Sequence, residues 1–387
     1  MSQAAVAPIL PSRAGASERQ LRSRRVKDLA LEAGFDLVGI ALPDVFERER
    51  AALAQRIDAG LFSGLPWFTR DRAEVASDPR ALLPEARSVI ALALSYDTGD
   101  GPAGVIARYA WGQDYHEVIR GHLKSLQRRL AEEFGEFEFR NFVDTGRLVD
   151  RAAAARAGLG WYGKNTNLLN TTLGSWLFLA ELVTTLDLQP DEPTRQNCGQ
   201  CHACIDVCPT GAITAPYVVD NNRCISFLTI ELRGPIPRDL RPLMGSYIFG
   251  CDLCQDVCPV NAQAQPVHHP EFAFQGQLGT VDELAALLLL SEDDFRARFR
   301  HTAIMRTKRR GLLRNVCVAL GNSGAASAVG PLIHALRTDP EPLVRGHAAW
   351  ATGRLRHPPA RQALQAAAQT ETDPYVLEEI ACALTPQ

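Results

Sequence analysis

The chain has 387 residues, of which 46% are hydrophobic and 22% are charged, so it is long enough for two or three domains with sizeable cores. Lysine and arginine total 41 against 44 for aspartate and glutamate, which excludes a global positive field that would draw the molecule onto nucleic acid. The chain has no run of eighteen uncharged apolar residues, so we expect no membrane span. Acidic residues follow Arg24 and Arg25 where an export signal needs an apolar segment, and we therefore expect a cytoplasmic protein.

The first half of the chain is expected to form an α+β domain. Residues 1–16 are rich in Ala, Pro and Ser without periodicity and are predicted to be a loose N-terminus. Residues 17–188 alternate between helical and strand-like patterns, which predicts a mixed α/β domain of catalytic size. We expect helices over residues 21–34, 117–134 and 148–157, and strands over residues 36–41, 88–95, 137–143 and 176–186.

Two further regions follow. Residues 189–268 are rich in Cys, Pro, Gly and Asn and too poor in periodic apolar residues to fold without metal, which predicts a ferredoxin-like insert. Within residues 278–387 the segment 312–320 recurs loosely at 343–351 and 376–384, and this period predicts an all-α domain of HEAT-like repeats. Cys317 and Cys382 fall in these repeats and are predicted to be small core residues.

The other eight cysteines lie between Cys198 and Cys258. The pattern C-x2-C-x2-C-x3-C-P that begins at Cys198 has the bacterial ferredoxin spacing, in which the fourth cysteine binds a second [4Fe-4S] cluster. The pattern C-x2-C-x3-C-P that begins at Cys251 is one cysteine short, and Cys224 can supply the missing thiolate. The crossover predicts a first cluster on Cys198, Cys201, Cys204 and Cys258, and a second on Cys208, Cys224, Cys251 and Cys254.

A pair of four-cysteine zinc sites is the alternative, because paired C-x-x-C motifs also make tetrahedral zinc sites. The third closely spaced cysteine of each run and the prolines that follow favour two cubane clusters. Two neighbouring clusters carry single electrons, so we expect an electron acceptor elsewhere in the chain and an external electron donor.

Four segments carry a family resemblance: residues 143–146 (VDTG), 160–165 (GWYGKN), 224–231 (CISFLTIE) and 308–315 (KRRGLLRN). Together with the cysteine-rich insert and the repeats, they resemble the epoxyqueuosine reductase family over nearly all of the chain after residue 16. The resemblance implies a core similar to that of corrinoid reductive dehalogenases, with cobalamin bound beside the clusters. It also implies reduction of the epoxide of epoxyqueuosine in the tRNA anticodon to the alkene of queuosine, the final step of queuosine biosynthesis, by a protein that we expect to be a monomer.

The resemblance assigns the role of proton donor to Asp144, at the end of a predicted strand. A neutral aspartic acid would require burial to raise its pKa. The alternative is an N-cap, since Asp144 precedes the helix predicted over residues 148–157.

Cobalamin contacts are expected from the 160–165 segment, whose glycines permit close backbone approach, although such a segment is more often a simple tight turn. Aromatic walls and polar groups from the ferredoxin side are expected to complete the site, although most aromatic residues merely fill cores. The predicted cobalamin site comprises Trp67, Tyr109, Asp144, Tyr162, Gly163, Lys164, Asn165, Ser226 and Arg233.

A basic patch could hold the tRNA. Residues 295–338 contain no acidic side chain, and phosphates favour such a patch through counterion release. The alternative is a solvated helix face whose arginines pair with the acidic residues 292–294. The predicted tRNA contacts are Arg296, Arg298, Arg306, Lys308, Arg309, Arg310 and Arg314.

Two other functions remain open from the sequence. A reductive dehalogenase would share corrinoid and clusters, but the basic repeat region and the expected absence of an export signal count against it. An electron-carrying ferredoxin module on a HEAT scaffold would need no corrinoid, but it leaves the large α/β region without a role.

Overall fold

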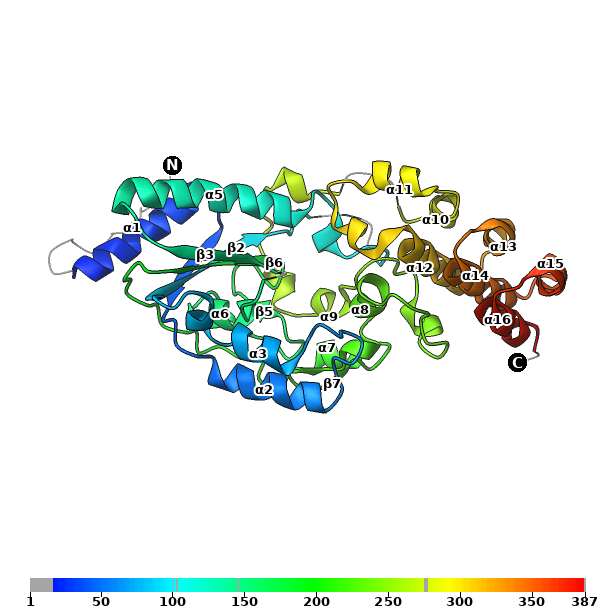
Figure 1. Cartoon of the computed structure of the whole chain (residues 1–387), viewed down its shortest axis with the longest axis horizontal. Helices are drawn as coiled ribbons and strands as arrows, with labels where there is room; N and C mark the ends of the chain where they lie inside the picture. Colours follow the sequence, from blue (N-terminus) through cyan, green and yellow to red (C-terminus); the bar gives the residue numbers. More distant parts are fainter. Residues whose placement is uncertain (1–16, 100, 102–103, 145, 275–277, 386–387) are drawn as a thin grey trace, which may run out of the picture.

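The computed structural model describes residues 17–99, 101, 104–144, 146–274 and 278–385, so the predicted loose N-terminus lies outside the described residues. An α/β region occupies one end of an elongated molecule and the C-terminal helices occupy the other, with the cysteine-rich insert between them (Figure 1). Among the described residues, no helix combines the length and the apolar character needed to cross a membrane.

A four-stranded antiparallel sheet organises the α/β region. Its strand order is β1-β2-β6-β3, with β2 and β6 in the centre. The strands are β1 (Leu37–Ala41), β2 (Ser88–Ser95), β3 (Phe139–Val143) and β6 (Leu177–Thr184). Every residue of β2 is buried because helices cover both faces of the sheet, which explains its continuous apolar run. All four predicted strands are confirmed, with ends within two residues of the prediction.

Helices α1 (Glu18–Glu32) and α5 (Tyr115–Phe134) cover one face of the sheet, and α6 (Asp150–Arg156) covers the other (Figure 1). Leucine and isoleucine side chains of α5 pack on Ile90 and Leu92 of β2. Three consecutive alanines of α6 are buried with Ala91 and Val183, and their small size allows α6 to lie close to the sheet. The three predicted helices are confirmed.

The sequence prediction missed α2 (Glu47–Asp58), α3 (Arg70–Ala76) and the single turn α4 (Pro79–Leu82). All residues of α2 are described, and none of them is buried. The helix therefore has no continuous apolar stripe that a periodic pattern in the sequence could reveal. Helices α2 and α3 form one side of the site described below.

Short elements connect the sheet to the cysteine-rich insert. The hairpin β4 (Trp161–Tyr162) and β5 (Leu168–Leu169) precedes β6. The insert contains the single turns α7 (Ala203–Asp206) and α9 (Leu253–Asp256), the hairpin β7 (Ile213–Ala215) and β8 (Val218–Val219), and helix α8 (Ile225–Ile230). Its α-helices are one or two turns long, and its small apolar core includes Phe227, Ile236 and Met244.

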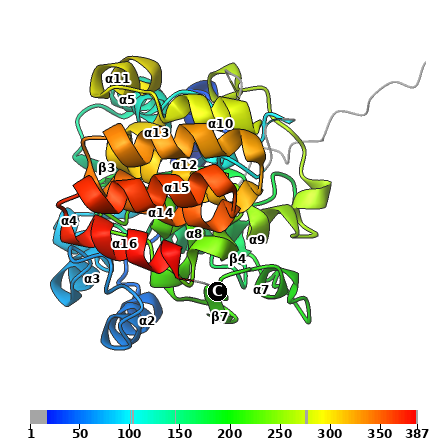
Figure 2. The ribbon, with the colours of Figure 1, turned by 90° about the vertical axis from the view of Figure 1, so that its right-hand side faces the viewer.

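The C-terminal helices pack side by side in layers (Figure 2). They are α10 (Val281–Leu287), α11 (Glu292–Phe299), α12 (Lys308–Ser323), α13 (Val329–Thr338), α14 (Pro342–Leu355), α15 (Pro358–Thr370) and α16 (Pro374–Leu384), with the 3-10 helix η6 (Ala303–Thr307) before α12. Proline in the first turn starts α14, α15 and α16, where its missing N–H costs no hydrogen bond.

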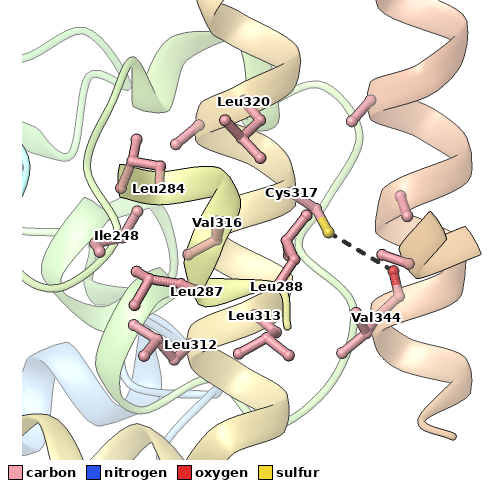
Figure 3. Close-up of a cluster of buried hydrophobic side chains, with 14 of the residues drawn as sticks. Ile248, Leu284, Leu287, Leu288, Leu312, Leu313, Val316, Cys317, Leu320 and Val344 are labelled. Carbon is pink, nitrogen blue, oxygen red and sulfur yellow. Dashed lines mark hydrogen bonds between the residues drawn. The ribbon is translucent and has the colours of Figure 1, made fainter. Parts of the chain in front are cut away.

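Helix α12 forms the centre of the C-terminal core. Its apolar residues Leu312, Leu313, Val316 and Leu320 are fully buried and lie beside the leucines of α10 (Figure 3). Cys317 is fully buried with its Sγ 3.9 Å from the carbonyl oxygen of Val344, so its predicted core role is confirmed. The same prediction is wrong for Cys382, which is exposed. Ile380 on the same helix is buried, and residues two positions apart point to different sides of a helix.

Polar contacts join the repeats to the insert. The guanidinium of Arg241 donates two hydrogen bonds of 2.8 Å to the carboxylate of Glu379 on α16, and both side chains are buried. His347 of α14 accepts from the backbone N–H of Ile236 at 3.2 Å. The described regions therefore pack against one another, and the domain limits 17–188, 189–268 and 278–387 stay predictions.

Glu379→Ala should lower the free energy of unfolding by about 3–5 kcal/mol, because it leaves the buried guanidinium of Arg241 without its counter-ion. Urea unfolding followed by circular dichroism measures the loss. Glu378→Ala is the matched control: its side chain is 64% exposed and pairs with Arg238 at the surface, so the expected loss is about 1 kcal/mol or less. Equal losses for the two variants would contradict the assignment.

Candidate functional site

A cavity of about 1090 Å³ lies between the sheet, helices α2 and α3, the insert and η6. This volume is at the upper end of the range for small-molecule sites, about 300–1,000 Å³. Its wall is mostly apolar but contains carboxylates, tyrosines and cysteines from segments far apart in the sequence. From the predicted cobalamin site it brings together Trp67, Tyr109, Asp144, Tyr162, Asn165 and Ser226.

Asp144 lies in this wall directly after β3. Its backbone has φ 48°, in the left-handed region that aspartate tolerates better than most residues. Strain of this kind, where a strand ends at a cavity, is common at functional sites. The N-cap of α6 is Val149 rather than Asp144, so the capping alternative is excluded.

Two ring side chains from the start of α5 face the Asp144 carboxylate. The hydroxyl of Tyr115 donates to its Oδ2 at 2.5 Å, and Nε2 of His116 lies 3.8 Å from the same oxygen. Nδ1 of His116 is 2.9 Å from Oδ1 of Asp114, which also caps α5 by accepting from the His116 N–H. Burial, and then the charge of Asp144, raises the pKa of Tyr115, so this tyrosine stays a neutral donor.

The sequence interpretation missed Tyr115 and His116 because it started this helix at residue 117. A signal was present: Asp114 is a good N-cap residue, and the two ring side chains follow it directly. Asp150, at the first turn of α6, was also missed. It lines the cavity, and burial, only partly offset by Arg151, raises its pKa to about 6.

The cysteines form two groups of four. Burial, and then the neighbouring thiolates of Cys198, Cys258 and Cys201, raises the pKa of Cys204. Burial, with smaller contributions from Cys224 and Cys208, raises the pKa of Cys251 to about 12. The group that lines the cavity is Cys208, Cys224, Cys251 and Cys254. The other group is Cys198, Cys201, Cys204 and Cys258.

Each group fits a cubane better than a single metal ion. In the described part of the chain, no three His, Cys, Asp or Glu side chains converge closely enough to hold one ion, as a tetrahedral zinc site would require. A [4Fe-4S] cluster instead places its four thiolates around a larger body. The grouping therefore suits two clusters, of which only one borders the cavity.

Three residues predicted to contact cobalamin do not line the cavity. Lys164 Nζ donates to the carbonyl oxygens of Gly199 and Cys201, both at 2.8 Å, and so ties the β4–β5 hairpin to the first cysteine run. Gly163 packs against Asn165, whose Oδ1 would lie 2.6 Å from an added Cβ. Arg233 donates to the carbonyl oxygen of Arg306 at 2.9 Å. Lys164 and Arg233 thus hold neighbouring segments in place, and cobalamin contacts from these three residues stay predictions.

The predicted basic patch divides into outward and inward side chains. Arg296, Arg298, Arg306 and Lys308 are exposed and Arg310 is half-buried. Arg306 also lines the cavity and forms an ion pair with Glu231. Arg296 pairs with Glu292 at 3.3 Å, as the solvated-face alternative supposed.

Arg309 and Arg314 are buried, which corrects their prediction as phosphate contacts. Arg309 pairs with Asp339 at 2.6 Å. Arg314 donates to the carbonyl oxygens of Leu228, Leu232 and Gly234 at 2.6–2.8 Å. Both guanidinium groups are used inside the protein and cannot reach a phosphate.

Comparison with known proteins identifies the family. Residues 77–145 match the family model described as Epoxyqueuosine reductase QueG, DUF1730. The epoxyqueuosine reductase of Bacillus cereus is 38% identical over 359 residues, which cover 90% of this chain and 92% of that relative. The chain belongs to the epoxyqueuosine reductase family. It is therefore an oxidoreductase, and this membership favours epoxide reduction over the dehalogenase and electron-carrier alternatives.

Solved epoxyqueuosine reductases have the same fold. A crystal structure with a tRNA-Tyr epoxyqueuosine-modified tRNA stem loop is 34% identical and has a TM-score of 0.86, covering 93% of this chain and 97% of that chain. The Bacillus subtilis enzyme is 32% identical with a TM-score of 0.85 and the same coverage, and its catalytic aspartate loop is swung out of the active site.

Family models also match the two remaining regions. Residues 197–261 match a 4Fe-4S double cluster binding domain, and residues 302–385 match HEAT repeats. The predicted fold class, an α+β region with a two-cluster ferredoxin-like insert and HEAT-like repeats, is therefore confirmed.

Cys224→Ser should lower the iron content from about eight to about four atoms per chain, because it removes one ligand of the second group. Anaerobic purification followed by iron and sulfide analysis measures the change. Cys382→Ser is the control: that thiol is exposed on α16, so full iron content is expected. Full iron content in Cys224→Ser would show that this cysteine is not a ligand.

Proposed function

We propose that this chain reduces the cyclopentane epoxide of epoxyqueuosine at the wobble position of tRNA to the alkene of queuosine. The overall step consumes two electrons and two protons, breaks both epoxide C–O bonds and releases the oxygen as water. The observation that carries the proposal is that one cavity contains both a carboxyl group on a strained turn, Asp144, and one complete group of four cysteines.

Electrons are proposed to enter through the cysteine group remote from the cavity, because Cys201 in that group is exposed. From there they pass to the second group, whose cysteines line the cavity wall. An external donor must dock near the exposed group. A cytoplasmic monomer is consistent with this arrangement and belongs to the proposal.

Cobalamin is proposed to occupy the part of the cavity beside Cys224 and Cys251. The residues proposed to hold it are Trp67, Tyr109, Tyr162, Asn165 and Ser226, all of which line the cavity. When bound, the corrinoid supplies a strongly reducing cobalt centre that couples the single electrons of the clusters to a two-electron reduction. Asn165 also donates to the carbonyl oxygen of Cys254 at 3.2 Å, which joins this wall to the second cysteine group.

Asp144 is proposed to protonate the leaving oxygen. The catalytic aspartate of the Bacillus subtilis relative lies on a loop that moves, and Asp144 likewise follows a strand on a left-handed turn. Tyr115 positions its carboxyl group by donating to Oδ2, and His116 limits where that oxygen can lie. These two contacts aim the half-exposed Asp144 carboxyl group at the cavity, where it can reach the oxygen of a bound substrate.

The tRNA is proposed to lie across η6 and the exposed ends of α11 and α12. Arg306 is at the cavity and Lys308 follows it, so phosphates held here would bring the anticodon loop to the opening. The wobble nucleotide must leave its stack to enter, which is the usual solution when chemistry is performed on a base. The remaining outward contacts are proposed to be Arg296, Arg298 and Arg310.

Asp144→Asn should slow conversion by about 100-fold or more, because the amide keeps the shape but cannot deliver a proton. Tyr115→Phe should cost about tenfold, the effect of losing one hydrogen bond worth about 1.4 kcal/mol that positions the Asp144 carboxyl group. Single-turnover conversion of epoxyqueuosine-containing tRNA, followed by mass spectrometry of the nucleosides, measures both rates.

Asp239→Asn is the control for these variants, because this aspartate is exposed outside the cavity and its loss should leave the rate unchanged. Cofactor content and tRNA affinity are measured on every variant. A normal rate in Asp144→Asn with full cofactor content would remove this residue from the mechanism.

Lys308→Ala and Arg296→Ala should each weaken tRNA binding and reduce the slope of log affinity against log salt by about 1. Binding to a stem loop at several salt concentrations, followed by fluorescence anisotropy, measures the slope. Arg128→Ala is a matched control, since Arg128 is as exposed as Arg296 and pairs with an acidic residue at the same i,i+4 spacing, but on α5. Equal slopes for all three variants would place the tRNA elsewhere.

A further inference from the structure

Arg72 of α3 is a cavity-lining side chain that the proposed mechanism does not use. Its Nη2 donates to the carbonyl oxygen of Gly146 at 2.9 Å, and its Cζ lies 4.8 Å from the centre of the Trp67 ring. Burial, and then the charge of Arg147, lowers the pKa of Arg72, and no carboxylate of the described residues forms an ion pair with it. The guanidinium therefore serves a backbone carbonyl group and an aromatic ring instead of a counter-ion.

The carbonyl group that Arg72 holds belongs to the segment directly after the proposed proton donor. Gly146 lies two residues after Asp144, and it packs on Phe142 so closely that an added Cβ would lie 2.7 Å from that ring. Further along, the N–H of Val149 donates to the carbonyl oxygen of Ala76, the last residue of α3, at 3.1 Å. Helix α3 therefore holds the segment 146–149 at two points.

The backbone of Asp144 needs such support. Its φ of 48° lies in the left-handed region, and a conformation of this kind persists only where the surrounding structure fixes it. Before Asp144, the pairing of Val143 with Ala180 of β6 fixes the chain. The Asp144 side chain is 51% exposed, so its own packing does not decide where the carboxyl group lies. The contacts with α3 are therefore needed to fix the chain on the other side of Asp144.

Helix α3 is itself firmly attached and can act as a fixed support. The Oγ1 of Thr69 caps the helix by accepting from the N–H of Arg72 at 3.2 Å. Nε of Arg50 on α2 pairs with Glu74 of α3 at 3.2 Å, which joins the two helices. Two alanines of α3 are also buried. The position of the Arg72 backbone is thus set independently of the segment that its side chain holds.

We propose that Arg72 is a positioning residue for Asp144: by holding the carbonyl group of Gly146, it maintains the backbone conformation that directs the Asp144 carboxyl group into the cavity. This inference rests on the proposed function. Arg72 touches no reacting atom and acts only through Asp144. The ring of Trp67 limits where the guanidinium can lie, so the wall proposed for cobalamin and the segment proposed for proton transfer share one arginine.

Arg72→Met keeps an unbranched side chain beside Trp67 but removes the hydrogen-bond donor. It should slow single-turnover conversion of epoxyqueuosine-containing tRNA by about tenfold, the effect of losing one hydrogen bond that positions the donor. The half-saturating tRNA concentration and the iron and cobalt contents should match those of the wild type. Arg72→Lys retains a donor for the carbonyl group and should recover most of the rate.

Arg70→Met is the matched control. Arg70 lies two residues earlier on α3, is 57% exposed, pairs with Asp58 and does not line the cavity, so its loss should leave the rate unchanged. Equal rates for Arg72→Met and Arg70→Met would overturn the positioning role.

A double variant separates positioning of Asp144 from a general loss of structure. If Arg72 acts only through Asp144, adding Arg72→Met to Asp144→Asn should slow conversion no further than Asp144→Asn alone. A further tenfold loss, about the effect of Arg72→Met in the wild type, would show that Arg72 acts independently of Asp144 and would overturn the inference.

Hydrogen–deuterium exchange of the cofactor-loaded protein gives a readout besides activity. The amides of residues 146–149 should exchange about tenfold faster in Arg72→Met than in the wild type, because one of the two contacts of this segment with α3 is lost. The amides of α5 should exchange at the same rate in both proteins. Unchanged exchange at residues 146–149 would show that Arg72 does not hold this segment.

The outcomes separate this inference from the proposed function. A wild type that converts epoxyqueuosine-containing tRNA, with Arg72→Met equally fast, overturns the positioning role alone. A fully cofactor-loaded wild type without conversion overturns the proposed function and, with it, this role of Arg72.

Discussion

The buried guanidinium of Arg314 is the contact on which the rest of the site depends. It extends from α12 into the insert and donates to three backbone carbonyl oxygens at residues 228, 232 and 234, while the amide of Asn315 reaches the carbonyl oxygens of Thr229 and Ile248. These acceptors belong to α8 and the segments around it, which also carry Cys224 and Ser226. Because Arg314 has no solvent exposure, its hydrogen bonds are not screened by water, and α8 cannot move relative to α12 without breaking several of them.

The hydrogen bonds of Arg314 hold the cysteine-rich insert and the basic start of α12 at the same cavity. The insert packs its own small apolar core, which includes Leu228 and Met244, against Val318 of α12 and takes its position from that helix. Helix α12 begins at Lys308, immediately after η6 with its cavity-lining Arg306. The same helix therefore fixes the cysteines on its buried side and presents basic groups on its exposed side. A substrate bound by its phosphates is thereby held at a constant distance from the electron source.

The sequence predicted the parts whose signal is local. Strand β2 was visible as an apolar run, and most members of the two cysteine groups followed from the ferredoxin spacing of the two cysteine runs. The inward orientation of Arg309 and Arg314 was not visible, because a run of arginines looks the same whether its members face solvent or buried carbonyl oxygens. The hydrogen bonds of Lys164 were hidden for the same reason: its partners are carbonyl oxygens in another segment, which side-chain patterns do not reveal.

The site beside Asp144 could not be predicted from the sequence, because its residues come from helices on opposite faces of the sheet. Tyr115 comes from α5, which covers one face, whereas Asp150 comes from α6, which covers the other, and only the end of β3 brings them to one cavity. Their environments share one property: burial raises the pKa of Tyr109, Tyr115 and Asp150 and so favours their neutral forms. Neutral tyrosines beside a centre that receives electrons remain hydrogen-bond donors, because each arriving negative charge raises the pKa of the groups around it.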